Sequence, residues 1–295
     1  MTKSKARGNL PDRVVTAVAD RRTTILEIIR GTKRQLWLSL FRCNDDEMFA
    51  EIARAVSRGV AVEVLTTARA KGGRKRLRKL WAALGETGGA VHAYADPVVK
   101  YHAKYLVADD GPALVATLNF TRKCFARTWD ALVVTYDPDV VSGLQQLLAA
   151  DRDGRPLPEP LSSRLIVGPE RARLQLLSLI EGAQSSIRLI DAKISDPQVA
   201  EVFNARRASG VNVEIIGSKR LGDLKSHGKI MLIDNRIAVV GSLALAALSL
   251  DFRREVAIVV DDPAAVADVN QLFETIAAVV ATAPIAGEST GVAPC

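Results

Sequence analysis

Two of the three histidines in the chain begin the same short pattern, and this repetition is the strongest chemical signal in the sequence. His102 opens HAKYLVADD and His227 opens HGKIMLIDN, so a lysine follows each histidine at the second position and an aspartate at the seventh. An imidazole can attack an electrophile or transfer a proton near neutral pH, and an ammonium group can bind an anion. A single short motif often arises by chance, but two copies indicate a functional site.

The residues around each motif predict a buried strand that orients it. A run of Tyr, Leu, Val, Ile and Met follows each histidine, which is typical of a strand covered on both faces. Because side chains alternate between the faces of a strand, His102 and Lys104 point the same way, as do His227 and Lys229. Each strand therefore presents an imidazole beside an ammonium group.

Further acidic residues follow each motif at matching positions. Asp109 and Asp234 end the motifs on the opposite face of their strands, so we assign them a structural role in fixing a turn. Each motif then continues through a turn, an apolar strand and a pair of small and hydroxyl residues to an acid, Asp130 or Glu255, that opens another apolar strand. The two pairs are Ala116-Thr117 and Gly241-Ser242.

Internal repetition extends well beyond the motifs. ILEIIRGTKRQLWL at 25–38 aligns with LLSLIEGAQSSIRL at 176–189, and only the first half has an extra segment between about Arg69 and Pro97. The run DRDGRPLPEPLSS, rich in proline and charge, is the one convincing linker. We predict a flexible basic N-terminus at 1–12, a first repeat at 13–155, a linker at 156–163, a second repeat at 164–281 and a flexible tail at 282–295.

Hydrophobic periodicity predicts an α/β fold with mostly buried sheets. Helices are expected at residues 13–30, 46–58, 138–150, 170–182, 197–209 and 263–281. Strands are expected at residues 35–41, 61–66, 103–108, 113–117, 131–136, 186–191, 212–217, 229–233, 236–241 and 255–260.

With its doubled motif and the residues that follow, the sequence resembles a two-repeat member of the phospholipase D superfamily, from about Arg21 to Val280. The resemblance implies two pseudo-symmetric α-β-α sandwich lobes with one active site at their interface. It also implies a metal-independent phosphodiesterase or phosphatidyltransferase, similar to phospholipase D or cardiolipin synthase, that forms a covalent phosphohistidine. No cofactor and no metal are expected.

By this resemblance, the two motifs divide the work of breaking a phosphodiester. His102 would attack phosphorus, and His227 would protonate the departing alcohol and then activate the incoming water or alcohol. Lys104 and Lys229 would hold the phosphoryl oxygens. Which histidine attacks stays open at this point, as does the choice between hydrolysis and transfer.

The resemblance also implies that an acid from the opposite repeat orients each histidine, Glu255 for His102 and Asp130 for His227. The pattern departs from the family at Ala116-Thr117, where Gly-Ser is usual, at Asp130, where glutamate is commoner, and at Ala244, where asparagine is expected. Since both histidines and both lysines remain, we expect an active enzyme. Candidates for phosphate binding, with turn formation and capping as alternatives, are Asn119, Thr117 and Ser242.

A formal net charge of +7 and a pI near 9.4 indicate an anionic partner, and both phospholipid and nucleic acid qualify. The run KGGRKRLRK precedes Trp81, and it suggests an interfacial helix with the indole in lipid headgroups, a grip on a nucleic-acid backbone, or a solvated basic helix. The cations proposed to bind an anionic surface are Arg74, Lys75, Arg76, Arg78 and Lys79.

We expect the substrate to be a phospholipid, cleaved or exchanged at its headgroup. The alternatives are a nuclease or nucleic-acid phosphodiesterase, and a weakly active protein that binds anionic phosphate. Three widely spaced cysteines indicate free thiols, and the N-terminus lacks a signal-peptide pattern, so we expect a cytoplasmic protein that associates peripherally with the membrane. The internal pseudo-dimer predicts a monomer.

Overall fold

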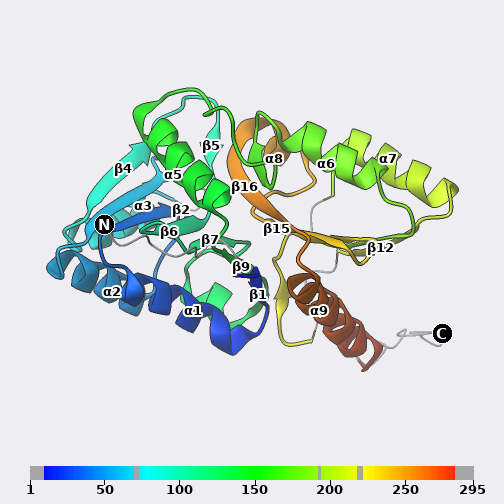
Figure 1. Cartoon of the computed structure of the whole chain (residues 1–295), viewed down its shortest axis with the longest axis horizontal. Helices are drawn as coiled ribbons and strands as arrows, with labels where there is room; N and C mark the ends of the chain where they lie inside the picture. Colours follow the sequence, from blue (N-terminus) through cyan, green and yellow to red (C-terminus); the bar gives the residue numbers. More distant parts are fainter. Residues whose placement is uncertain (1–9, 70–72, 192–193, 218–221, 283–295) are drawn as a thin grey trace, which may run out of the picture.

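The computed structural model describes residues 10–69, 73–191, 194–217 and 222–282, which form two lobes side by side (Figure 1). Each lobe is a β-sheet between helices, so the predicted α/β class with two α-β-α lobes is confirmed. Residues 1–9 and 283–295, predicted as parts of flexible ends, lie outside the described residues.

The sheet of the first lobe has the strand order β1-β9-β7-β6-β2-β3-β4. Helices α1 and α2 cover one of its faces and α5 covers the other (Figure 1). The strands are β1 (Arg13–Val15), β2 (Gln35–Leu40), β3 (Ala61–Thr67), β4 (Ala90–Tyr94), β6 (Tyr105–Ala108), β7 (Ala113–Ala116) and β9 (Leu132–Thr135). The helices are α1 (Val18–Gly31), α2 (Asp46–Ser57), α3 (Arg74–Gly85), α4 (Arg122–Ala126) and α5 (Pro138–Asp153).

The sheet of the second lobe repeats this topology in the order β10-β16-β15-β14-β11-β12. Strand β11 pairs in parallel with β12 and antiparallel with β14, as β2 does with β3 and β6. The strands are β10 (Leu165–Gly168), β11 (Ser186–Ile190), β12 (Asn212–Ile216), β14 (Ile230–Ile233), β15 (Ile237–Gly241) and β16 (Arg253–Val260). The helices are α6 (Ala172–Glu181), α7 (Pro197–Ala208), α8 (Ala247–Phe252) and α9 (Pro263–Thr282).

The structure corrects the predicted start of the first helix. Residues 13–15 were expected to be helical, but they form β1, where Val14 pairs with Val133 of β9. The apolar spacing at these residues suits either a helix or a strand. Pairing with β9 favours the strand, and local periodicity cannot reveal such a tertiary contact. Strand β10 was missed for the same reason, since it pairs only with β16. The extra segment of the first half supplies α3 and β4, and β4 adds one strand to the sheet of the first lobe.

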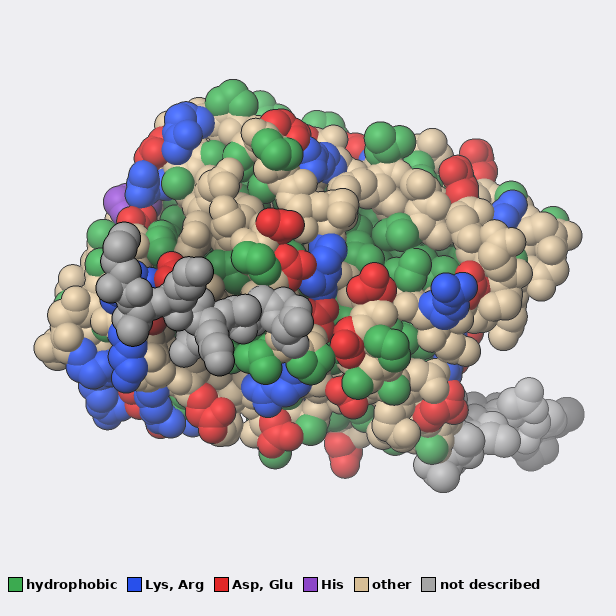
Figure 2. Space-filling view, viewed as in Figure 1, with side chains coloured by type: hydrophobic (Ala, Val, Ile, Leu, Met, Phe, Trp, Pro, Cys, Tyr) green, Lys and Arg blue, Asp and Glu red, His purple; other side chains and the backbone are tan. Residues whose placement is uncertain are grey.

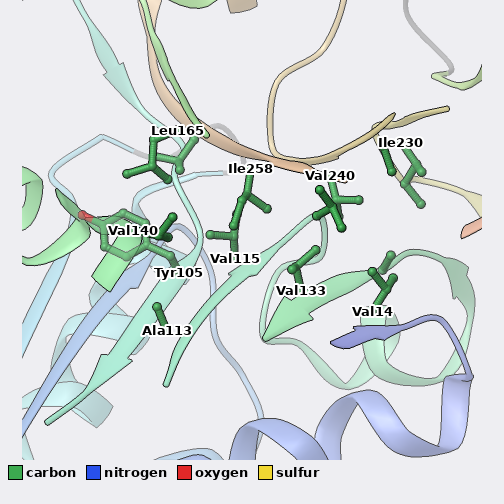
Figure 3. Close-up of a cluster of buried hydrophobic side chains, with 14 of the residues drawn as sticks. Val14, Tyr105, Ala113, Val115, Val133, Val140, Leu165, Ile230, Val240 and Ile258 are labelled. Carbon is green, nitrogen blue, oxygen red and sulfur yellow. The ribbon is translucent and has the colours of Figure 1, made fainter. Parts of the chain in front are cut away.

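One hydrophobic core joins the two lobes. Val115 and Val133 of the first sheet lie in the same buried cluster as Val240 and Ile258 of the second (Figure 3). Helices α5 and α9 contribute further apolar residues to this cluster. The two lobes therefore fold against one another as a single body, and their common face is where the motif strands meet.

Candidate active site

Two short strand pairs cross between the lobes and carry the motif histidines. Strand β5 (Lys100–Tyr101) of the first lobe runs parallel to the start of β16, and β13 (Lys225–Ser226) of the second lobe runs parallel to β8 (Thr128–Trp129). The backbone N–H of His102 donates to the carbonyl of Arg254 at 2.9 Å, and that of Gly228 donates to Trp129 at 2.8 Å. Each motif thus begins beside the acid-bearing strand of the other lobe.

The acids bond to the histidines in the crossed arrangement that the sequence suggested. Nδ1 of His102 is hydrogen-bonded to Oε1 of Glu255, and Nδ1 of His227 lies 2.9 Å from Oδ1 of Asp130. Both carboxylates are completely buried, whereas the two imidazoles are partly exposed. With Nδ1 engaged by a carboxylate, Nε2 is the nitrogen of each ring that could attack or transfer a proton.

The electrostatic surroundings favour a neutral His102. Burial is the main cause that holds its pKa well below 6.5, and the nearby charges of Lys104 and Lys229 add to it, followed by those of Arg253 and His227. The influence of groups from both motifs shows that the two halves of the site form one electrostatic unit. A neutral ring at pH 7 keeps a lone pair available for attack.

The two lysines lie against the backbone of their own motifs. Nζ of Lys104 donates to the carbonyl of His102, and Nζ of Lys229 donates to the carbonyl of His227 at 2.6 Å. Burial lowers the pKa of Lys104 to about 7, and the charge of Glu255 only partly offsets this effect. An anion bound in the site would favour the ammonium form of Lys104.

The two orienting acids differ in their ionisation. Burial raises the pKa of Glu255 to about 7, against the opposing effect of its hydrogen bond with Ser249. Burial acts on Asp130 in the same direction, but the charge of His227 and hydrogen bonds from His227 and Thr117 outweigh it and lower the pKa of Asp130. The pseudo-symmetric halves therefore have unlike proton affinities, as separate nucleophile and acid roles require.

Two of the predicted phosphate ligands have other partners. Oγ1 of Thr117 donates to Oδ1 of Asp130 at 2.6 Å, and Oγ of Ser242 donates to the carbonyl of Val256 at 3.3 Å and accepts from its N–H at 3.1 Å. Both hydroxyls are buried, so we assign them to the support of the strands and the acid. Oδ1 of Asn119 is also buried and has no hydrogen-bond partner among the described residues.

Ser249 is a functional candidate that sequence reasoning missed. Its hydroxyl donates to Oε2 of Glu255 and accepts from the N–H of Ala244 at 2.9 Å, and the side chain is fully buried. Glu255 therefore bonds through one oxygen to His102 and through the other to Ser249. Nothing in the spacing of the motif marks this serine, because it lies on α8, between the hydroxyl pair and the acid.

The motif aspartates cap turns, as predicted. Three backbone N–H groups of residues 33–35 donate to the carboxylate of Asp109, and those of residues 184–186 donate to Asp234. Burial opposes ionisation of both acids, but these hydrogen bonds prevail and lower each pKa. Both residues have positive φ angles near 50°, a left-handed conformation that aspartate tolerates.

The basic segment, residues 71–79, lies largely on α3 of the first lobe. The indole N–H of Trp81 donates to the carbonyl of Thr67 at 3.3 Å, and Leu80 and Leu84 are buried beneath the helix. Trp81 is partly buried and its indole N–H is bonded to its own lobe. Lys71 and Gly72 lie outside the described residues. The cations that the structure leaves exposed are Arg74, Lys75, Arg76, Arg78 and Lys79.

Charged side chains cover much of the surface outside the site. Figure 2 shows Lys and Arg gathered at the outer end of the first lobe, with acidic and basic side chains mixed over the rest of this face. Among the described residues, none of the helices combines the length and apolar character that crossing a bilayer requires. Association with an anionic surface through α3 stays a prediction.

Comparison with solved structures relates the whole two-lobed fold to known proteins. Polyphosphate kinase from Porphyromonas gingivalis superposes with a TM-score of 0.73 at 18% identity, over 90% of this chain and 50% of the kinase, so this chain spans about half the length of that protein. Phosphatidylserine synthase from Haemophilus influenzae superposes with a TM-score of 0.70 at 13% identity, over 92% of this chain and 88% of the synthase. At these identities the likeness establishes the fold.

Family membership rests on the sequence match to a domain model. No curated protein sequence matches the chain. The model described as "Cardiolipin synthase, PLD-like domain" matches residues 25–152 and 220–277, which include both histidine motifs and both acids. Because this match covers more than half of the chain and the fold has two phospholipase D-like lobes, the chain belongs to the phospholipase D-like family of cardiolipin synthase domains.

Proposed function

We propose that the chain is a metal-independent phosphodiesterase or phosphatidyltransferase that acts on phospholipid headgroups. One observation carries the catalytic part of this proposal, namely the pair of crossed histidine-carboxylate contacts, His102 with Glu255 and His227 with Asp130. Each contact joins the two lobes, so the site holds two oriented imidazoles, as a two-step displacement at phosphorus requires.

The unequal surroundings of the two rings support different roles for them. His102 is held neutral, so its Nε2 attacks phosphorus while the bond from phosphorus to the leaving alcohol breaks. His227, paired with the ionised Asp130, gives its proton to the oxygen of that alcohol. Water or a second alcohol then loses a proton to His227 and displaces His102 from phosphorus. Lys104 and Lys229 balance the charge of the phosphoryl oxygens throughout.

An apolar and cationic rim beside the site favours a lipid substrate. Lys100 of β5 and Arg253 of β16 are paired residues, so the segments that precede them emerge at the same end of the two strands. These segments carry Val98 and Phe252, which are 61% and 46% exposed, and α8 adds Leu248 at 63%. Exposed apolar side chains next to cations suit a surface that meets acyl chains and anionic headgroups together.

The descriptions of the matching family model and of one similar solved structure support the same substrate class. The matching family model is described as a cardiolipin synthase domain, and phosphatidylserine synthase shares the fold over most of both chains. Nucleic acid is the competing substrate, since the chain carries a formal net charge of +7. Aromatic residues make up 5% of the sequence, which gives little material for base stacking.

The proposal is tested by supplying lipid and nucleic acid side by side. Purified protein with excess chelator is incubated with labelled phosphatidylglycerol vesicles, phosphatidylcholine vesicles, and single- and double-stranded DNA. We expect release or exchange of a lipid headgroup and none of it with the His102→Ala variant. Cleavage of DNA alone would overturn the lipid assignment, and a requirement for metal would overturn the chemistry.

A second comparison tests the rim itself. The double variant Leu248→Ser and Phe252→Ser should lose activity on vesicles while it keeps activity on a soluble short-chain diester, because only the vesicle has to meet the rim. The control is Leu174→Ser, since Leu174 is also apolar and is 77% exposed, but lies on α6. Equal losses on vesicle and soluble substrate would contradict a role in interfacial binding.

A further inference from the structure

The two halves of the site differ in one side chain next to the acid. In the second lobe, Ser249 of α8 bonds to Glu255. The repeat alignment that matches Asp137 with Asp262 places Cys124 of α4 at the equivalent position in the first lobe. Sulfur therefore stands beside Asp130 where oxygen stands beside Glu255. Cys124 is 6% exposed and is a free thiol.

This substitution brings together three kinds of metal ligand. Sγ of Cys124, a carboxylate oxygen of Asp130 and a ring nitrogen of His227 all lie within 4.8 Å of one another. A tetrahedral zinc ion with bonds of about 2.0–2.3 Å separates its ligands by about 3.3–3.8 Å, so a modest contraction would suffice. The side chain of His227 is 31% exposed, so solvent reaches this group of ligands through the imidazole.

We propose that Cys124, Asp130 and His227 form a binding site for one zinc ion, and that zinc inhibits the enzyme. A thiolate, an imidazole and a carboxylate are the ligands that zinc combines most readily, and the thiol releases its proton to solvent when the metal binds. The metal site stands on geometry alone, and only the inhibition rests on the proposed function.

Inhibition follows from what the metal does to His227. As acid and base, this ring has to alternate between its neutral form and the imidazolium, which carries a proton on each nitrogen. A nitrogen bonded to zinc cannot take a proton, so the ring loses the imidazolium form, whichever nitrogen the metal occupies. Zinc would also bind an oxygen of Asp130. This carboxylate orients the ring, since its Oδ1 lies 2.9 Å from Nδ1 of His227.

The second half of the site is a built-in comparison. There Ser249, Glu255 and His102 occupy the equivalent positions, and a neutral hydroxyl is a poor zinc ligand. The Cys124→Ser variant makes the first half resemble the second and changes one atom. It should fold, because serine is the residue that the second half of the site carries at this position, and its activity without zinc is the reference for its own zinc titration.

The binding experiment uses cobalt as a spectroscopic probe and zinc as its competitor. All proteins carry Cys295→Ser, since Cys295 lies outside the described residues and could bind metal itself. We expect one cobalt ion per chain, with a near-ultraviolet thiolate-to-cobalt absorption band that zinc abolishes. Cys124→Ser should lose the band and at least tenfold in zinc affinity. The matched control Cys43→Ser removes the other buried thiol and should change neither.

Activity measurements separate the inhibition from the metal site. Zinc should inhibit the parent and Cys43→Ser at the concentrations that saturate binding, chelator should restore activity, and Cys124→Ser should need at least tenfold more zinc. A cobalt band that survives in Cys124→Ser, or no binding to the parent, would overturn the metal site. Saturation with zinc at unchanged activity would overturn the inhibition. A protein without activity on any diester would fail the proposed function, while the cobalt spectrum would still decide the metal site.

Discussion

Removal of one hydroxyl, Ser249→Ala, tests how the His102 half of the site, to which we assign the nucleophile, is held. Ser249 donates to Oε2 of Glu255, and the other oxygen of Glu255 accepts from Nδ1 of His102. The carboxylate is fully buried, so water cannot replace the lost donor without entering the core. The variant therefore acts on His102 through Glu255 and does not touch the substrate.

The size of the effect follows from the type of hydrogen bond. A hydrogen bond to a charged group contributes about 1.5–3 kcal/mol, which corresponds to about one to two pKa units. Burial already raises the pKa of Glu255 to about 7, and loss of a donor to the carboxylate form raises it further. At pH 7 most of Glu255 is then protonated, and it no longer offers His102 a negatively charged acceptor. We expect kcat/KM at pH 7 to fall by about 10- to 100-fold.

The assay is a profile of kcat/KM against pH. Activity requires ionised Glu255, so the acid limb, near pH 7 in the parent, should move about one to two units upward in Ser249→Ala. The control is Ser242→Ala, since Ser242 is equally buried in the same lobe but bonds only to the backbone of Val256. It should leave the limb in place. A uniform loss without a shift in Ser249→Ala would refute the reasoning.

Four further variants test other parts of the structure. His227→Asn, assayed with a diester that has a good leaving group, should accumulate phosphohistidine, which intact mass spectrometry detects. Lys104→Arg should keep activity above pH 7, where the parent declines as Lys104, whose pKa burial lowers to about 7, loses its proton. Arg254→Met leaves the buried carboxylate of Asp151 without its ion-pair partner. It should lower the free energy of unfolding by about 3–5 kcal/mol, measured by urea denaturation. Gly241→Ala should lower Tm because its Cβ would lie 2.3 Å from Cα of Ala257, whereas Gly31→Ala, with open space, should not.

The chemistry of the site was predictable from the sequence because the motif itself carries it. Alternation along a strand places histidine and lysine on one face, and two copies need two lobes to form one site. The resemblance to the phospholipase D superfamily then suggested the crossed pairing of Glu255 with His102 and of Asp130 with His227, which the structure shows.

Contacts that depend on how the elements pack were not predictable. Ser249 lies six residues from Glu255, but the spacing alone does not reveal that α8 turns its hydroxyl toward the carboxylate. The buried hydroxyls of Thr117 and Ser242 looked like phosphate ligands because the family pattern includes that position. Only their contacts with Asp130 and with Val256 of β16 show that they bond inward. The edge strands β1 and β10 depend on their partners in the same way.

The two strand pairs that cross between the lobes, β5 with β16 and β13 with β8, also limit how the molecule can move. A clamshell opening about a hinge would break both ladders and expose the apolar contact of Val115 and Val133 with the second sheet. Turnover should therefore proceed without domain closure, on a rigid frame. Substrate has to arrive, and product to depart, along the outer edge of the seam.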